Sequence, residues 1–229
     1  ASAQMPNWIQ SSTASTPQAR SEHAMSYDSG RGKAVVFGGF DGASFISDTF
    51  EFDGTNWQQI TTTHSPPARA GHAMAYDSSR GKVIMFGGSD SSGFLNDTWE
   101  YDGIDWTSVT TANRPSARVE HAMAYDSVRG KVLIFGGLNG SYSFLNDTWE
   151  YDGTNWTQIT TVNPPSARIE HAMTYDSARS KVVVLGGFNS NLAALNETWE
   201  YDGSQWTLVT TAASPSARRD HAMIYDSMR

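Results

Sequence analysis

Arginine and histidine recur together along this chain, and both can do chemistry. Each of five arginines precedes a histidine by three residues, usually with an acidic residue between them. The arginines are Arg20, Arg69, Arg118, Arg168 and Arg218, and the histidines are His23, His72, His121, His171 and His221. A guanidinium group holds a carboxylate through paired hydrogen bonds, so the arginines are candidate ligand-binding residues. The structural alternative is an ion pair with the neighbouring glutamate or a hydrogen bond to the next repeat.

A metal or catalytic centre is the other chemistry to consider. The histidines recur in every unit with the same apolar neighbours, which predicts packed, hydrogen-bonded side chains rather than metal ligands. Acidic residues recur in the same way at Asp48, Asp97, Asp147 and Glu197, which favours a turn or strand-start cap. No nucleophile, base and orienting group stand at positions that occur once. We therefore predict no catalytic residue, no metal site and no cofactor.

A repeat of about fifty residues must position all these side chains. Consecutive histidines of the set are 49, 49, 50 and 50 residues apart. Glycine pairs and tryptophans keep the same step, at Gly38-Gly39, Gly87-Gly88, Gly136-Gly137 and Gly186-Gly187, and at Trp57, Trp106, Trp156 and Trp206. Such a period, with glycine pairs and aromatic residues at fixed offsets, is typical of propeller blades.

Each unit is predicted to be a four-stranded antiparallel meander. In the third unit the strands are expected at 121–125, 131–135, 147–151 and 156–160, joined by turn residues. The glycine pair after the second strand indicates that another backbone passes close by. Loop 138–145 and its equivalents change most between units, and no stretch has helical periodicity. The sequence therefore predicts an all-β chain whose blades pack on one another.

The units resemble the kelch repeat. Arg-x-x-His, a strand ending in Phe-Gly-Gly, Asp-x-Trp-x-Tyr-Asp and a downstream tryptophan carry the resemblance over nearly the whole chain. The first unit departs mildly, with Phe50 and Phe52 where the others have Trp and Tyr. The resemblance implies a β-propeller of kelch-type four-stranded antiparallel blades. It also implies that the arginines lie near the channel mouth and hold carboxylates of a ligand, and it nominates Arg69, which lacks an acidic neighbour.

One domain over 1–229 is expected, possessing four complete blades and two incomplete ones. The blades are predicted at 20–68, 69–117, 118–167 and 168–217, with a terminal outer strand and linker at 1–19 and an inner strand at 218–229. The two middle strands of the split blade are missing, so the chain is expected to be part of a longer one or to be closed by other copies. An open blade would expose an aromatic face and strand edges that favour self-association.

The composition of the chain disfavours some classes of binding partner. The chain has 229 residues, a net charge of −8 and no cysteine. The negative charge disfavours nucleic acid and anionic membranes, and no apolar run is long enough to insert into a membrane. The absence of cysteine excludes disulfides and thiolate metal sites. The Thr, Ser, Asn and Trp richness, the scarcity of lysine and the start at Ala1 favour an extracellular or cell-surface protein.

The sequence thus favours a non-catalytic binding module that recognises a protein, peptide or glycan. The face expected to bind is built from the inter-blade and variable loops. Besides the five arginines, the aromatic residues that differ between units are ligand-binding candidates, namely Phe45, Phe94, Tyr142 and Phe144. The alternative is a structural protein whose open blade edges join copies into a ring, a fibre or a surface layer, and an enzyme is disfavoured.

Overall fold

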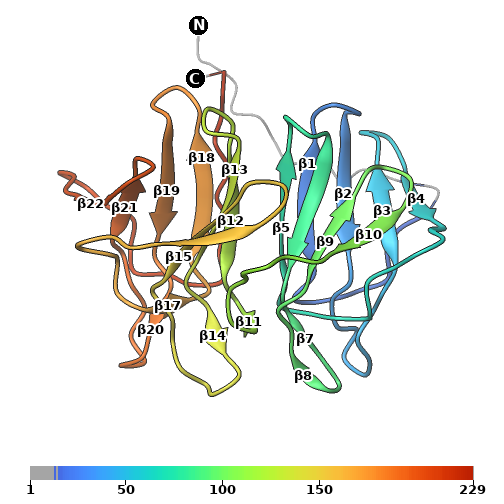
Figure 1. The fold of residues 1–229 in the computed structure, drawn as a ribbon, viewed down its shortest axis with the longest axis horizontal. Helices are drawn as coiled ribbons and strands as arrows, with labels where there is room; N and C mark the ends of the chain where they lie inside the picture. The colour runs from blue at the N-terminus through green and yellow to red at the C-terminus, as the bar shows by residue number, and fades with distance from the viewer. Residues whose placement is uncertain (1–12, 14, 229) are drawn as a thin grey trace, which may run out of the picture.

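Every regular element in the described part of the chain is a β-strand (Figure 1). The structure is a computed structural model, and it describes residue 13 and residues 15–228. The outer strand predicted around Trp8 lies outside these residues. No helix in the described part of the chain could cross a membrane.

Four antiparallel sheets of four strands follow one another along the chain. Blade 1 contains β1 (Ala24–Asp28), β2 (Lys33–Phe37), β3 (Thr49–Phe52) and β4 (Trp57–Ile60). Blade 2 contains β5 (Ala73–Asp77), β6 (Lys82–Phe86), β9 (Thr98–Tyr101) and β10 (Trp106–Val109). Blade 3 contains β12 (Ala122–Asp126), β13 (Lys131–Phe135), β15 (Thr148–Tyr151) and β16 (Trp156–Ile159). Blade 4 contains β18 (Ala172–Asp176), β19 (Lys181–Leu185), β21 (Thr198–Tyr201) and β22 (Trp206–Val209).

Short strands of two residues lie at one end of the blades, at the bottom of Figure 1. They are β7 (Ser89–Asp90), β8 (Gly93–Phe94), β11 (Arg118–Val119), β14 (Leu138–Asn139), β17 (Arg168–Ile169) and β20 (Phe188–Asn189). β7 and β8 form a hairpin, β11 pairs with β14, and β17 pairs with β20. This end carries the loops that vary most between units, and we call it the loop face.

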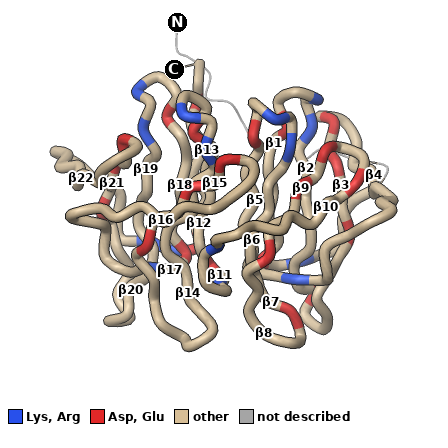
Figure 2. Tube along the Cα trace, viewed as in Figure 1, with Lys and Arg blue, Asp and Glu red and all other residues tan. Residues whose placement is uncertain are grey.

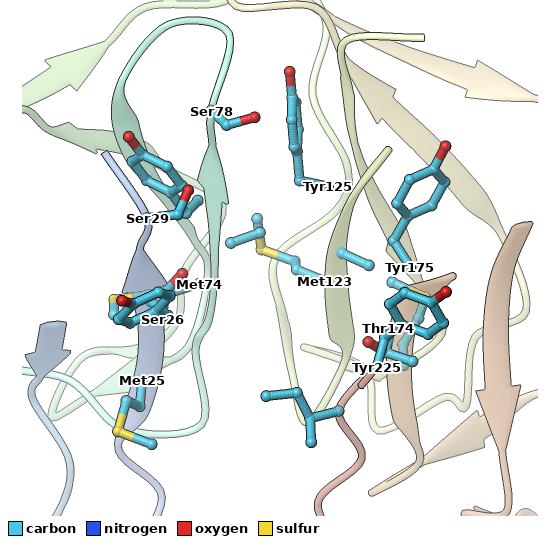
Figure 3. Close-up of a pocket in the computed structure, with 16 residues that line it drawn as sticks. Met25, Ser26, Ser29, Met74, Ser78, Met123, Tyr125, Thr174, Tyr175 and Tyr225 are labelled. Carbon is cyan, nitrogen blue, oxygen red and sulfur yellow. The ribbon is translucent and has the colours of Figure 1, made fainter. Parts of the chain in front are cut away.

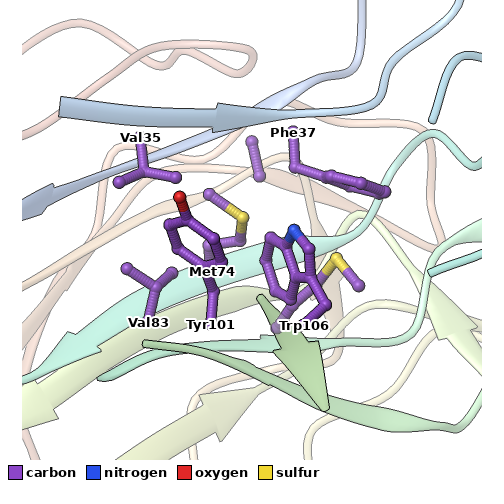
Figure 4. Packing of buried hydrophobic residues seen from close by; sticks show 8 residues of the cluster. Val35, Phe37, Met74, Val83, Tyr101 and Trp106 are labelled. Atoms are coloured by element: carbon purple, nitrogen blue, oxygen red, sulfur yellow. The ribbon is translucent and has the colours of Figure 1, made fainter. Parts of the chain in front are cut away.

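The blades are arranged radially, with the first strand of each blade innermost. β1 lies beside β5, β5 beside β12, and β12 beside β18. Three buried clusters fill the spaces between neighbouring blades. In the first cluster, Val35 and Phe37 of blade 1 meet Met74, Tyr101 and Trp106 of blade 2 (Figure 4). The fold predicted from the repeats, an all-β propeller of four-stranded blades, is confirmed.

Tryptophan from the fourth strand is the largest side chain in each interface. Trp106 is 1% exposed, and its ring lies 5.1 Å from that of Phe37. Its Nε1 donates a hydrogen bond to Thr49 Oγ1 of the preceding blade at 2.9 Å, and the Tyr101 hydroxyl donates to Glu51 Oε1 at 2.9 Å. Trp156 and Trp206 make the same bond to Thr98 and Thr148 at 2.9 Å. One side of every interface therefore supplies acceptors, and the other supplies aromatic donors.

The glycine pair of one blade receives the chain of the next blade. Gly87 and Gly88 have φ values of 68° and 93°, which a residue with a side chain rarely adopts. A Cβ atom on Gly87 would lie 2.8 Å from the carbonyl oxygen of Arg118 in blade 3. The Gly88 N–H donates to that same oxygen at 2.9 Å. The close backbone approach predicted from the glycine pair is confirmed.

The recurring histidines pack into the same junction. The ring of His72 meets Phe37 of the preceding blade edge-on, with ring centroids 5.7 Å apart, and His121 and His171 meet Phe86 and Phe135 at 5.8 and 5.5 Å. All three histidines are buried. Their ring nitrogens make no hydrogen bond of ordinary geometry with the described residues, so the packing was predicted correctly but the hydrogen bond was not. Burial, reinforced by the charge of the nearby Arg69 or Arg168, lowers the pKa of His72 and of His171 to about 3.

Residues 218–228 differ from the prediction of an inner strand. They are assigned to no strand, because no second strand of that unit lies beside them. They nevertheless dock on blade 4 as the other units dock on one another. The Gly187 N–H donates to Arg218 O at 2.9 Å, and the Asp220 N–H donates to Glu170 O at 3.1 Å.

We expect the free energy of unfolding to fall as the pH is lowered from about 6.5 towards about 3. In the folded protein, His72 and His171 take up protons only near the lower value, whereas an unfolded histidine does so near the upper one. The unfolded chain therefore binds more protons than the folded protein in this range. Each histidine then lowers the free energy of unfolding by about 1.4 kcal/mol for every pH unit of acidification. Urea unfolding between about pH 7 and pH 4.5 measures the slope. His171→Gln should reduce the slope, because it removes one of the buried histidines.

Candidate binding face

The recurring arginines are buried beneath the loop face rather than presented on it. Arg69, Arg118 and Arg168 are 0% exposed. The Arg118 guanidinium donates to Asp147 Oδ1 at 2.7 Å and to Asp147 Oδ2 at 2.8 Å, and it also donates to Gly136 O at 2.9 Å. Arg69 binds Asp97 in the same way at 2.6 and 2.8 Å, and Arg168 binds Glu197 at 2.7 Å. Each pair joins the start of a blade to the start of its third strand.

The carboxylate partner is held ionised by this arrangement. Burial alone would raise the pKa of Asp147, but hydrogen bonds from Arg118 and Trp149, together with the charge of Arg118, lower it below its ordinary value. The pKa of Asp97 is lowered in the same way by Arg69 and Trp99. The strand-start cap predicted for these acids is therefore wrong in its detail, since the acids are partners of the buried arginines.

This placement contradicts the prediction that Arg69, Arg118 and Arg168 contact a ligand. Their donors are directed at carboxylates and carbonyls within their own blade, and no solvent reaches them. Arg20 has a side chain only 4% exposed and is paired with Asp48. Arg218 alone of the five is exposed, and among the described residues its guanidinium bonds only to Ser216. The glutamate two residues after each arginine, proposed as an alternative partner, is not the partner either.

Instead, the residues two positions after the arginines form a hydrogen-bonded series that runs from blade to blade beside the inner strands. Glu22, Gly71, Glu120, Glu170 and Asp220 all have positive φ, between 53° and 67°. From Gly71 onward, the N–H of each donates to the carbonyl oxygen of the equivalent residue in the preceding blade, at 2.9, 3.0, 3.2 and 3.1 Å in chain order. Glycine adopts this backbone conformation without strain, which explains Gly71 without any role in ligand binding.

Carboxylates consequently converge at the mouth of the central channel. Burial and the negative charges of Glu170, Glu22 and Asp220 raise the pKa of Glu120 to about 7. Burial and the charge of Asp220 also raise the pKa of Glu170. Figure 2 shows acidic positions at this end of the molecule, including the β7–β8 hairpin that carries Asp90. Arg219 also lies at this mouth, with a guanidinium nitrogen 3.1 Å from Glu170 Oε2. The four acids outnumber it, so the mouth carries a net negative charge, unlike the arginine-lined mouth that was predicted.

The four aromatic candidates do lie on the loop face. Phe45 packs against Phe40 with ring centroids 5.4 Å apart. Phe94 of the β7–β8 hairpin meets Tyr142 of the next blade at 5.7 Å, so two variable loops touch across a blade boundary. Tyr142 is 74% exposed, while Phe45, Phe94 and Phe144 are half-buried. In blade 4 the exposed apolar position of the loop is occupied by Leu192, also 74% exposed.

A groove of about 410 Å³ runs along the inner strands at the opposite end of the channel. Figure 3 shows Met25 and Met74 on one wall, and Tyr125, Tyr175 and Tyr225 on the other. The same methionine and tyrosine positions recur in every unit, and the Tyr125 hydroxyl lies 2.5 Å from Ser79 Oγ of the preceding blade. These side chains join blades to one another, so the groove has the repetitive character of the interfaces rather than that of a specific site.

The sequence interpretation missed the carboxylate series because it read each glutamate as a partner of its arginine. One signal was available. Gly71 replaces Glu at one copy of this position, and exchange between glycine and a polar residue indicates a left-handed backbone. No cluster of three or more histidines and acids arranged to hold a metal occurs among the described residues.

Arg118→Met should destabilise the protein by about 3–5 kcal/mol, because it leaves the Asp147 carboxylate partly buried without its cation. Chemical denaturation measures the change. The matched control is Arg218→Met, at a position with no acidic partner, where we expect little effect. Adding Asp147→Asn to Arg118→Met should restore much of the loss, and a double variant no more stable than Arg118→Met would contradict the ion-pair explanation.

Glu120→Gln should stabilise the protein at about pH 8 and leave it unchanged near pH 4. Folding raises the pKa of the Glu120 carboxyl, so this group favours the folded state while it is protonated. That contribution is lost as the pH rises from the ordinary pKa of a glutamate to about 7. The amide removes this loss, which is on the order of 1 kcal/mol or less because water screens a half-buried charge. Parallel urea titrations of both proteins at the two pH values give the difference. Equal gains at both would argue against charge repulsion.

Comparison with protein families supports this architecture. The family model described as Attractin/LZTR1 beta-propeller matches residues 2–155 and, in a second alignment, residues 44–228. Together the two matches cover residues 2–228. No curated protein matches the chain. The kelch resemblance is therefore confirmed, and the chain belongs to the Attractin/LZTR1 β-propeller family, a kelch-type propeller family of interaction domains.

Proposed function

We propose that this domain binds a protein partner through its loop face, and that the bound segment is positively charged. One observation carries the proposal. Side chains shared by all units lie in blade interfaces and buried ion pairs, whereas those that differ between units lie on the loop face. A scaffold of this kind presents variable loops on a rigid frame, as binding proteins do.

The aromatic residues would supply the apolar part of the contact. Tyr142 and Leu192 project from neighbouring loops and are 74% exposed. Phe94 supports Tyr142 from the adjacent blade at 5.7 Å. Aromatic side chains backed by a rigid neighbour are frequent anchors of protein interfaces, because they bury a large area at little entropic cost.

The negative charge of the channel mouth favours a partner with positive charge. Glu22 and Asp220 are exposed, and Glu120 and Glu170 are half-buried beside them. Burial and the repulsion between these carboxylates raise the pKa of Glu120 to about 7, and a lysine or arginine of a partner would relieve the repulsion. This reverses the acidic ligand that the kelch resemblance implied from the arginines. Complementary charge of this kind contributes mainly to association rate and specificity.

Selection of random peptides displayed on phage against the full chain tests the proposal. We expect enriched sequences to contain Lys or Arg next to an aromatic or aliphatic residue. Binding of the enriched synthetic peptide should weaken about tenfold or more with Tyr142→Ser, and with Glu170→Gln at low salt. Ile104→Ser, at a residue 76% exposed on a turn of blade 2, is the control and should leave affinity unchanged.

Enrichment of acidic peptides, or binding that survives both loop-face changes, would overturn the proposal. A glycan array run with the same variants separates the remaining alternative. Binding to glycans that is lost with Tyr142→Ser, with no peptide enriched, would assign the loop face to carbohydrate instead.

A further inference from the structure

Blade 1 has one face with no neighbouring blade among the described residues. In the other blades, the tryptophan of the fourth strand is 0–4% exposed and donates to a threonine of the preceding blade. Trp57 occupies this position in blade 1, with its ring tilted against that of Phe52 at a centroid distance of 5.0 Å. It is only half-buried, and its Nε1 has no acceptor in the described part of the chain. Met25 and Tyr27 of the same face are each 60% exposed.

Blade 4 has an uncovered face of the opposite kind. The threonines that accept from tryptophan in the interior interfaces are at most 2% exposed, whereas Thr198 is half-buried and accepts no bond from the described residues. Leu185 stands where the other blades have a phenylalanine that is 0% exposed, and it too is half-buried. The Arg179 side chain is 54% exposed, compared with 26–34% for its equivalents.

The two faces are the two halves of the interface that the molecule already builds three times. We propose that blade 1 of one copy docks on blade 4 of a second copy, in the geometry of the interior blade pairs. Trp57 Nε1 would then donate to Thr198 Oγ1, as Trp206 donates to Thr148 at 2.9 Å. Leu185 would cover the Trp57 ring, as Phe135 covers that of Trp206 with centroids 5.0 Å apart.

Charge complementarity adds a further contact. Arg31 lies 5.5 Å from the ring centre of Tyr101 in the following blade, and Arg129 lies 5.2 Å from that of Tyr201. The exposed Arg179 would sit over Phe52 in the same way, which favours a cation over an aromatic face. One interior bond has no equivalent, because Phe52 lacks the hydroxyl through which Tyr101 donates to Glu51. Glu200 remains paired with Arg179, so no acid is left without a cation.

Residues 218–228 occupy part of this docking surface. Their sequence from His221 to Asp226 repeats that from His23 to Asp28 except at Ile224, so they stand where β1 of the incoming copy belongs. They lack strand pairing, and Ile224 is 87% exposed, so they are held less firmly than a complete blade. The incoming blade displaces them, and the segment acts as a competitor for association.

Such a contact is head-to-tail, because the two surfaces are different. It closes into a ring if the rotation between copies permits, and otherwise extends into a filament. Either assembly uses the same pair of faces. A contact between two identical faces would bring together two sets of donors or two sets of acceptors.

Sedimentation equilibrium of the full chain over about 1 to 100 μM tests the proposal. We expect association, weakened tenfold or more by Trp57→Ala on one face or by Leu185→Asp on the other. An equimolar mixture of these two variants should recover a heterodimer, since each retains the face that the other has lost. Tyr225→Ala, which removes the side chain whose hydroxyl bonds Asp176, should loosen residues 218–228 and strengthen association.

Ile104→Ser, away from both faces, is the matched control and should associate like the unaltered chain. Thermal unfolding of every variant shows whether it is folded, and Arg179→Met replaces Leu185→Asp if the latter is not. A monomer at all concentrations overturns the proposal. Association that only one of the two faces affects, or variants that do not complement each other, overturns it as well.

Discussion

The fold depends on one contact between backbones, in which the glycine pair of one blade accepts the start of the next. A Cβ atom on Gly136 would lie 2.7 Å from the carbonyl oxygen of Arg168, and the Gly137 N–H donates to that oxygen at 2.9 Å. Any side chain at this pair would push the blades apart. The contact fixes the distance between blades, and with it the spaces that the tryptophans and histidines fill.

This close junction also determines where charge can go. The arginine that begins each blade is enclosed by it, so its charge must be satisfied inside the blade by a carboxylate about 29 residues further along the chain, as in the pair of Arg118 and Asp147. Breaking a buried ion pair of this kind strongly destabilises the fold, and the pair cannot contact a ligand. Recognition is left to residues outside the junction, which means the variable loops, the carboxylates at the channel mouth and the uncovered end faces.

The sequence predicted the architecture well because its information was local or periodic. The period, the glycine pairs and the strand composition sufficed for the blades and for the burial of the histidines. The sequence did not predict the partners of the arginines. The true partner of Arg118 is distant in sequence, whereas Glu120 is only two residues away and is the more obvious candidate. The backbone at Glu120 is left-handed, with φ of 57°, and its carboxyl group lies close enough to Glu170 and Glu22 to be affected by their charges.

The polarity of the interface has a consequence for any set of consecutive blades. Each blade offers threonine, glutamate and apolar side chains on one face, and tryptophan with an aromatic neighbour on the other, as Thr148 and Trp156 illustrate in blade 3. An open row of such blades ends in one face of each kind, whatever its length. The ends are therefore complementary to each other and not to themselves, so the interactions that hold the blades in order also set the direction in which further blades can be added.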